Sequence, residues 1–139
     1  MCCRLVVKCS AIHGQGCYAG EPIAAGALVA EYLGEVICAE EAYRREQDPA
    51  RPGIYTFWTG ETQAIDGLFG GNASRFINHC CTPTCDYRIE DGRVFIHAAR
   101  DLAAGEELTI DYSFAAEGER VPCRCGVPAC RGRINAIPD

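Results

Sequence analysis

Three cysteines near the C-terminus have a spacing typical of a metal site. Cys123, Cys125 and Cys130 form a C-x-C-x4-C pattern, and Gly126 and Pro128 bend the chain between them. Three thiols this close together cannot all pack in a core, and thiolates are common ligands of structural zinc. Because a closed tetrahedral zinc site needs four ligands, the pattern predicts one more sulfur or imidazole from elsewhere in the chain.

The stretch GNASRFINHCCTPTCDY, residues 71–87, can supply the missing ligand. It contains His79 and three cysteines, Cys80, Cys81 and Cys85. The stretch fits a metal site, a thiol active site or a loop that wraps a cofactor. A thiol enzyme is the weakest of these interpretations. Residues adjacent in sequence rarely face each other as base and nucleophile, and zinc would consume a thiolate.

The composition predicts one compact domain with a genuine core, since 48% of the 139 residues are hydrophobic. The net charge is −6 and no basic stripe is visible, so we expect no direct contact with nucleic acid. An acidic surface is better suited to a basic protein partner. The basic residues are twelve arginines and one lysine, Lys8.

Eleven cysteines without a recognisable secretion signal favour metal binding over a disulfide framework. No apolar run approaches the roughly 20 residues that span a bilayer. We therefore expect a soluble intracellular protein that does not contact membranes. Cys17 and Cys38 lie in apolar, strand-like segments, and we expect both to be buried.

The hydrophobic pattern predicts many short strands, one helix and large loops, which is a mostly β (β-rich α+β) fold. The helix is expected at residues 39–47, with ion pairs Glu40–Arg44 and Glu41–Arg45. The segment 27–37 is interrupted by polar residues and glycine, so two short strands are expected there. Further strands are predicted within residues 4–10, 54–58, 62–66, 86–90, 93–99 and 106–112, with a hairpin turn at Asp91-Gly92.

The ordered motifs resemble those of the SET-domain protein lysine methyltransferases. The matching stretches are HGQGCYAGEPIAAGALVAEYLGEVI, IYTF, AIDGLFGGNASRFINHCCTPTC, GEELTIDYSF and CRCGVPACRGRIN, in the family's order over nearly the whole chain. The resemblance implies small, mostly antiparallel sheets and a knot-like crossing of the RFINHCCTPTC and ELTIDY segments. It also implies a SET domain at residues 1–114 and a zinc-binding post-SET tail at residues 115–139.

The resemblance assigns roles to individual residues. Tyr112 matches the catalytic tyrosine, and Tyr32 and Tyr55 match aromatic positions near the lysine channel and the cofactor. Tyr32 is therefore expected to be catalytic together with Tyr112. Cys81 matches the cysteine that completes the zinc site of the tail, with Cys80 and Cys85 as rivals. The residues implied to bind or flank S-adenosylmethionine are Gly14, Gly16, Tyr55, Arg75, Phe76, Asn78 and His79.

The implied activity is methyl transfer from S-adenosylmethionine to a lysine ε-amine in a protein substrate such as a histone or another basic tail. The alternative is a non-catalytic module that keeps the fold and the zinc. We expect a nuclear location if the substrate is chromatin and a cytoplasmic one if the protein is microbial. Relatives usually have Tyr or Phe where Ile110 stands, and a hydroxyl there limits how many methyl groups are added. Ile110 therefore predicts a product that is not capped at monomethyl-lysine.

Overall fold

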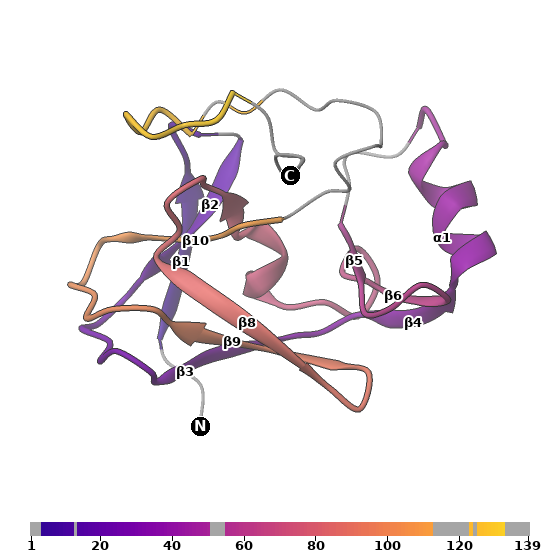
Figure 1. Cartoon of the computed structure of the whole chain (residues 1–139), viewed down its shortest axis with the longest axis horizontal. Coiled ribbons are helices and arrows are strands. Elements are labelled where there is room, and N and C mark those ends of the chain that lie inside the picture. Colours follow the sequence, from indigo (N-terminus) through magenta and orange to yellow (C-terminus); the bar gives the residue numbers. More distant parts are fainter. Residues whose placement is uncertain (1–3, 13, 51–54, 113–122, 124, 133–139) are drawn as a thin grey trace.

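The computed structural model of the chain describes residues 4–12, 14–50, 55–112, 123 and 125–132. Within these residues, short strands form three small sheets, and one α-helix lies to one side of them (Figure 1). The elements are β1 (Leu5–Cys9), β2 (Gln15–Ala19), β3 (Leu28–Tyr32), β4 (Glu35–Cys38), α1 (Ala39–Glu46), β5 (Thr56–Trp58), β6 (Gln63–Asp66), η1 (Ala73–Phe76), β7 (Asn78–His79), β8 (Cys85–Glu90), β9 (Arg93–Ala98) and β10 (Glu107–Ile110).

This arrangement confirms the predicted mostly β fold class. The apolar segment after residue 27 forms two strands, β3 and β4, and the predicted helix is α1. Strands β8 and β9 form the predicted hairpin, and Asp91 and Gly92 have the positive φ angles, 51° and 74°, that such a two-residue turn requires. The predicted domain boundary after residue 114 lies outside the described residues.

The sheet of strand order β1-β2-β10-β7 joins the segment that carries Asn78 and His79 to the segment that leads into Tyr112. Strand β10 pairs with β2 in antiparallel orientation and with β7 in parallel orientation. Thr109 lies opposite Asn78, and Ile110 lies opposite His79. The ladder places the RFINH segment beside the ELTIDY segment, as the resemblance implied.

The other two sheets have the strand orders β3-β9-β8 and β4-β6-β5. The main core lies between the first sheet and the β3-β9-β8 sheet, and its fully buried side chains include Cys17, Val29, Val94, Ile96 and Leu108. The burial of Cys17 confirms its prediction as a small hydrophobic residue. A smaller cluster under α1 contains Ile37, Ala42 and Ala64.

Two local predictions were wrong. Cys38 is exposed, because β4 is an edge strand and Cys38 occupies its end, at the N-cap of α1. Arg44 pairs with Glu41 and not with Glu40, so Glu41 binds Arg44 at i,i+3 and Arg45 at i,i+4, with N–O distances of 2.5 and 2.7 Å. Both arginines can reach Glu41, since residues three and four apart share one helix face.

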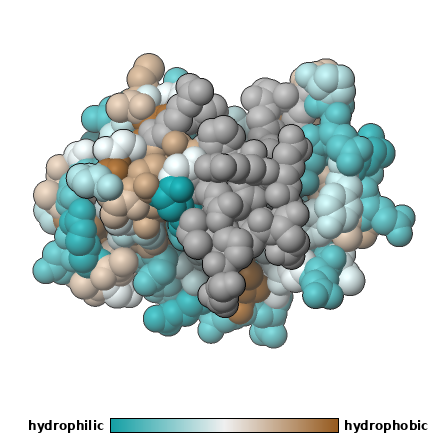
Figure 2. Space-filling model, turned by 45° about the horizontal axis from the view of Figure 1, so that its top comes forward, coloured by the Kyte–Doolittle hydropathy of each residue, from teal (hydrophilic) through white to brown (hydrophobic). Residues whose placement is uncertain are grey.

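The surface around α1 is largely hydrophilic, as Figure 2 shows at its right-hand side. This agrees with the charged sequence AEEAYRRE of the helix, whose acidic residues precede its basic ones. In the part of the chain that the structure describes, no helix combines the length and the apolar character needed to cross a membrane.

The turn that leads into η1 is held by a network around Asn72. Its side-chain oxygen accepts a hydrogen bond from the Ser74 backbone N–H at 3.1 Å, and its side-chain nitrogen donates to the Glu31 carbonyl at 3.0 Å. The preceding residue, Gly71, packs directly against the backbone of Gly67. A Cβ atom at position 71 would lie 2.1 Å from the Gly67 carbonyl oxygen. The turn therefore fixes η1 against β3 and requires glycine at position 71.

We predict that Gly71→Ala lowers the free energy of unfolding by about 3 kcal/mol, because the clashing atoms are backbone and cannot move aside easily. Chemical denaturation measures the change. Gly60→Ala is the matched control, since a Cβ atom there meets nothing within 4 Å. Equal stability of the two variants would contradict this account of the turn.

Candidate active site and zinc centre

A pocket with mainly aromatic and aliphatic walls lies at the crossing of β7 and β10. Residues from β3, β5, η1 and β10 and from the chain just after η1 and β10 surround it. They are Tyr32, Thr56, Phe57, Ser74, Arg75, Ile77, Ile110 and Tyr112. No carboxylate is among these described lining residues, and Arg75 contributes the positive charge.

The Tyr112 side chain is anchored within this crossing. Its hydroxyl donates a hydrogen bond to the Ile77 carbonyl at 2.5 Å, and its ring packs edge-on against His79. Burial raises the pKa of the Tyr112 hydroxyl above its usual range, and Tyr55 and Glu107 add to the effect. The phenol is therefore neutral at physiological pH. Because it donates its proton to Ile77, its oxygen can accept a hydrogen bond from a bound group.

Tyr32 contributes a wall of the pocket. Its side chain is buried, its ring packs on Phe57, and its hydroxyl donates to the Tyr55 carbonyl at 2.6 Å. The same hydroxyl lies against Gly67, where a Cβ atom would approach it to 2.6 Å. These contacts fix the ring, and they orient the hydroxyl toward backbone.

The residues predicted to hold the cofactor lie in two groups. In the first, the side-chain nitrogen of Asn78 donates to the Gln15 carbonyl and to the Glu107 carboxylate, each at 3.1 Å. Gly16 packs so closely on Glu107 that a Cβ atom would lie 2.6 Å from its carboxylate oxygen. The loop that begins at Gly14, which has a positive φ of 43°, therefore lies beside Asn78.

The second group is formed by Tyr55, Arg75 and Phe76. The rings of Tyr55 and Phe76 meet edge to face with centroids 6.4 Å apart, and the Arg75 guanidinium lies 4.7 Å from the centre of the Phe76 ring. Of these three residues, Arg75 also lines the pocket. The group thus combines two aromatic rings with one guanidinium and forms a cationic and aromatic surface.

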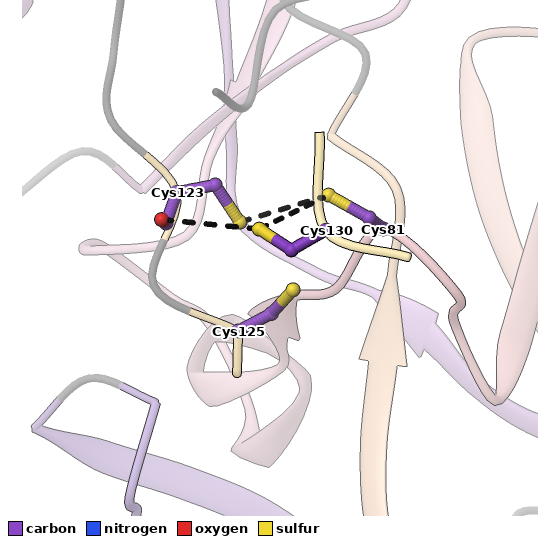
Figure 3. Close-up of side chains that lie close together, drawn as sticks. All are labelled: Cys81, Cys123, Cys125 and Cys130. Atoms are coloured by element: carbon purple, nitrogen blue, oxygen red, sulfur yellow. Dashed lines mark hydrogen bonds between the residues drawn. The ribbon is translucent and has the colours of Figure 1, made fainter. Parts of the chain in front are cut away.

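Four cysteine side chains from two distant parts of the chain point toward one another (Figure 3). Cys81 follows β7, and Cys123, Cys125 and Cys130 come from the tail. Their sulfur atoms all lie within 4.8 Å of one another; the Cys81 sulfur is 3.7 Å from that of Cys123 and 4.0 Å from that of Cys130. Four thiols gathered in this way fit a tetrahedral zinc ion.

The two rival cysteines point elsewhere. Cys85 lies in the core and is 1% exposed, and the Cys80 sulfur is 3.5 Å from the Thr82 carbonyl oxygen. Among the described residues, Cys81 is the cysteine of the 71–87 stretch whose sulfur lies with those of the tail cysteines. Within the four-cysteine cluster, burial raises the pKa of Cys123 to about 12. Burial also opposes ionisation of Cys125, but hydrogen bonds from the Cys81 and Val127 backbone lower its pKa to about 6.

His79 lies between the cysteine cluster and Tyr112. Its Nδ1 atom accepts a hydrogen bond from the Tyr112 backbone N–H at 3.0 Å, and its Nε2 atom is 3.6 Å from the Cys81 sulfur. Burial lowers the pKa of the His79 ring, so the ring is neutral and carries its proton on Nε2. His79 and Cys81 thus do face each other, contrary to the expectation for sequence neighbours. A protonated Nε2 cannot take a proton from the thiol, so the thiol-enzyme interpretation gains no support.

Residues 14–113 match the SET domain among known protein families. The chain belongs to the SET-domain family. Its relatives include a histone-lysine N-methyltransferase of Yarrowia lipolytica, described as H3 lysine-4 specific, which is 48% identical over 135 residues. The histone-lysine N-methyltransferase set1 of Dictyostelium discoideum is 40% identical over 139 residues. The histone-lysine N-methyltransferase trithorax of Drosophila melanogaster is 42% identical over 132 residues.

The matches cover 91% to 95% of this chain but only 12%, 9% and 4% of those three relatives, respectively. The chain therefore spans only a small part of the length of these relatives, and the remainder of each relative lies outside the match.

Several residues of this SET-domain site lie within the matching motifs but were given no role from the sequence. Thr56, Phe57 and Ile77 line the pocket, and Glu107 joins Asn78 to the loop before β2. Glu107 carries a usable signal, because it is a charged residue directly before three buried strand positions. The Ile77 contribution is a backbone carbonyl, which no side-chain pattern reveals.

We predict that the purified protein contains about one zinc ion per chain and that Cys81→Ser weakens zinc retention at least tenfold, because a hydroxyl is a poor substitute for a thiolate. Chelator competition with a chromogenic zinc reporter measures retention. Cys80→Ser and Cys85→Ser are matched controls from the same segment. Zinc loss caused by either control, with Cys81→Ser unaffected, would assign the fourth ligand differently.

Proposed function

We propose that this chain is the catalytic SET domain of an S-adenosylmethionine-dependent protein-lysine methyltransferase. The observation that carries the proposal is the apolar pocket lined by Tyr112, Tyr32 and Phe57, at the same strand crossing that holds Asn78. A long side chain with a reactive end group fits such a pocket. The relatives' names support a histone-lysine substrate.

The pocket chemistry favours an uncharged substrate amine, which is the form that can attack a methyl group. Apolar walls oppose the ammonium form by desolvation, and the nearby Arg75 guanidinium opposes it by charge. The neutral Tyr112 hydroxyl accepts a hydrogen bond from the amine and so orients its lone pair. Tyr112 thus acts in alignment, which is the main requirement of an in-line displacement.

The donor-binding residues are Asn78, the Gly14–Gly16 loop and the Tyr55–Phe76 surface. When bound, S-adenosylmethionine supplies an electrophilic methyl group on a sulfonium. Glu107 holds the Asn78 amide in one orientation, and its negative charge suits a donor that carries positive charge. Zinc at the four cysteines would hold the tail against the segment that contains Asn78 and His79.

The substrate we propose is the basic N-terminal tail of histone H3, methylated at its lysine-4. The observations that favour it are the H3 lysine-4 specificity in the names of six relatives, 44% to 48% identical, and the net charge of −6 of this chain. Opposite net charges speed the encounter of enzyme and tail. Such a substrate would place the protein at chromatin.

The zinc-loaded chain is expected to transfer labelled methyl groups to an H3 tail peptide, and not to a peptide in which lysine-4 is arginine. Tyr112→Phe should lower kcat about 100-fold or more, since loss of the aligning hydroxyl misplaces the amine. Donor affinity, measured by calorimetry, should stay within about threefold.

Tyr43→Phe is the matched control, because Tyr43 is 56% exposed on α1. Lys8→Arg removes the one lysine of the chain that self-methylation could label. Zinc binding without donor binding would support a non-catalytic module instead, and full activity of Tyr112→Phe would remove Tyr112 from the mechanism.

Ile110 leads to a second expectation for this reaction. It lines the pocket beside Tyr112 and has no hydroxyl to hydrogen-bond the amine or occupy the space of added methyl groups. We predict dimethyl and trimethyl products with excess donor, detected by mass spectrometry of the peptide. Ile110→Tyr should shift the product toward monomethyl-lysine, whereas Ile110→Leu should not. A wild-type product that stops at one methyl group would contradict this.

A further inference from the structure

A partly buried ion pair connects the cysteine tail to the chain directly after β10, which carries the proposed catalytic tyrosine. The Arg131 guanidinium donates to both carboxylate oxygens of Asp111, at 2.9 and 3.0 Å. Arg131 directly follows Cys130, and Asp111 directly precedes Tyr112. The pair therefore links the residue next to Cys130, a predicted zinc ligand, to the residue next to Tyr112, the proposed catalytic tyrosine.

This ion pair differs from those on the open surface of the protein. The Arg131 and Asp111 side chains are 17% and 34% exposed and those of Arg93 and Glu31 are 62% and 21% exposed, so the two pairs differ in how well the guanidinium is shielded. Both pairs have two-pronged geometry. Fully exposed ion pairs contribute little to stability. A two-pronged ion pair that is partly shielded from water, in contrast, fixes the relative position of the two segments that it joins.

Arg131 also contacts the cysteine cluster through its backbone. Its N–H group lies 3.4 Å from the Cys81 sulfur, in position to donate a hydrogen bond. The same residue thus meets Cys81 with its backbone and Asp111 with its side chain. Any rearrangement of the cluster that moves Cys81 or Cys130 moves Arg131 as well.

His79 forms a second connection between the same two places. It is 4% exposed, and its two ring nitrogens face the Tyr112 backbone N–H and the Cys81 sulfur. Its Nδ1 atom is also 3.5 Å from Asp111. The cluster and Tyr112 are therefore joined by a buried ring and by an ion pair, which lie next to each other.

We propose that Asp111, Arg131 and His79 form a clamp that couples zinc binding in the tail to the position of Tyr112 and so to donor binding. This inference rests on the proposed function, and within it Asp111 and Arg131 are positioning residues. Zinc fixes Cys130 and Cys81, the clamp transmits that order to β10, and the donor site beside β7 and β10 is ordered in turn. By linkage, donor binding must then strengthen zinc binding by the same factor as zinc strengthens donor binding, and slower zinc release is the expected kinetic sign of that coupling.

The first test measures zinc release to a chromogenic chelator from zinc-loaded wild-type and variant proteins, without donor. Asp111→Asn and Arg131→Ala should release zinc about tenfold faster, and Arg131→Lys, which keeps the charge, should fall between them and wild type. Arg93→Ala, which breaks the exposed pair, should release zinc at the wild-type rate. Wild-type release rates in all clamp variants would overturn the proposal.

The second test repeats the measurement with saturating S-adenosylmethionine. Donor should slow zinc release about fivefold or more in wild type and in Arg93→Ala, within the usual range of coupling between sites, but less than twofold in Asp111→Asn. Arg131→Lys should restore part of the slowing. A purely structural role would leave the donor effect the same in every folded variant, and that result would overturn the clamp.

The two proposals fail in different ways. If wild type binds no donor by calorimetry, the proposed function is wrong, while faster zinc loss from Asp111→Asn would still support the clamp. If wild type binds donor and its zinc release is unaffected, the function stands and the coupling is wrong. Circular dichroism checks that each variant is folded. If Asp111→Asn is unfolded, Arg131→Lys supplies the test.

Discussion

The short parallel ladder between β7 and β10 is the contact on which the remaining structure depends. It joins residues about 30 positions apart in sequence and consists of two residue pairs, Asn78 with Thr109 and His79 with Ile110. Parallel pairing is slightly less stable than antiparallel pairing, and so short a ladder cannot persist alone. The bonds around it must supply what the ladder lacks.

Those surrounding bonds come mostly from side chains. Thr84 accepts a hydrogen bond from the Thr109 backbone N–H and donates to the Glu107 carbonyl, so it acts as an additional strand partner for β10. Asn78 ties the ladder to the loop before β2, and His79 ties it to Tyr112. Buried polar groups cost free energy unless they are paired, so this network permits one arrangement of the crossing and penalises others.

The same constraint gives the candidate site its chemistry. Burial at the crossing raises the pKa of Tyr112 and keeps it protonated, and under the proposed function the mainly apolar pocket beside it favours an uncharged amine. The crossing thus brings together Ile110 and Tyr112 of the pocket wall, Asn78, and the stretch that carries Cys81 of the predicted zinc centre. The tail contacts these segments through the sulfur atoms of its cysteines and through the Asp111–Arg131 ion pair.

Local features of the fold could be read from sequence because nearby residues decide them. Asp91-Gly92 turns a hairpin by its own backbone preference, and α1 is marked by its charge order. The exposure of Cys38 could not be read in this way, because an apolar neighbourhood in sequence does not reveal that β4 is an edge strand. Arg44 pairs with Glu41 and not with Glu40. Both carboxylates are near Arg44 in sequence, so only their positions in space decide which one it binds.

The sequence by itself determined the family resemblance, the strand-rich fold class and the residue types available for a thiolate site and an aromatic pocket. Only the tertiary structure decided that Cys81, and not Cys80 or Cys85, joins the tail cysteines, because three nearby thiols of one type differ only in direction. It alone placed the Ile77 carbonyl, Glu107 and Arg131 at the site. Backbone acceptors and distant ion partners become functional through position, and position is set by long-range packing that no local pattern encodes.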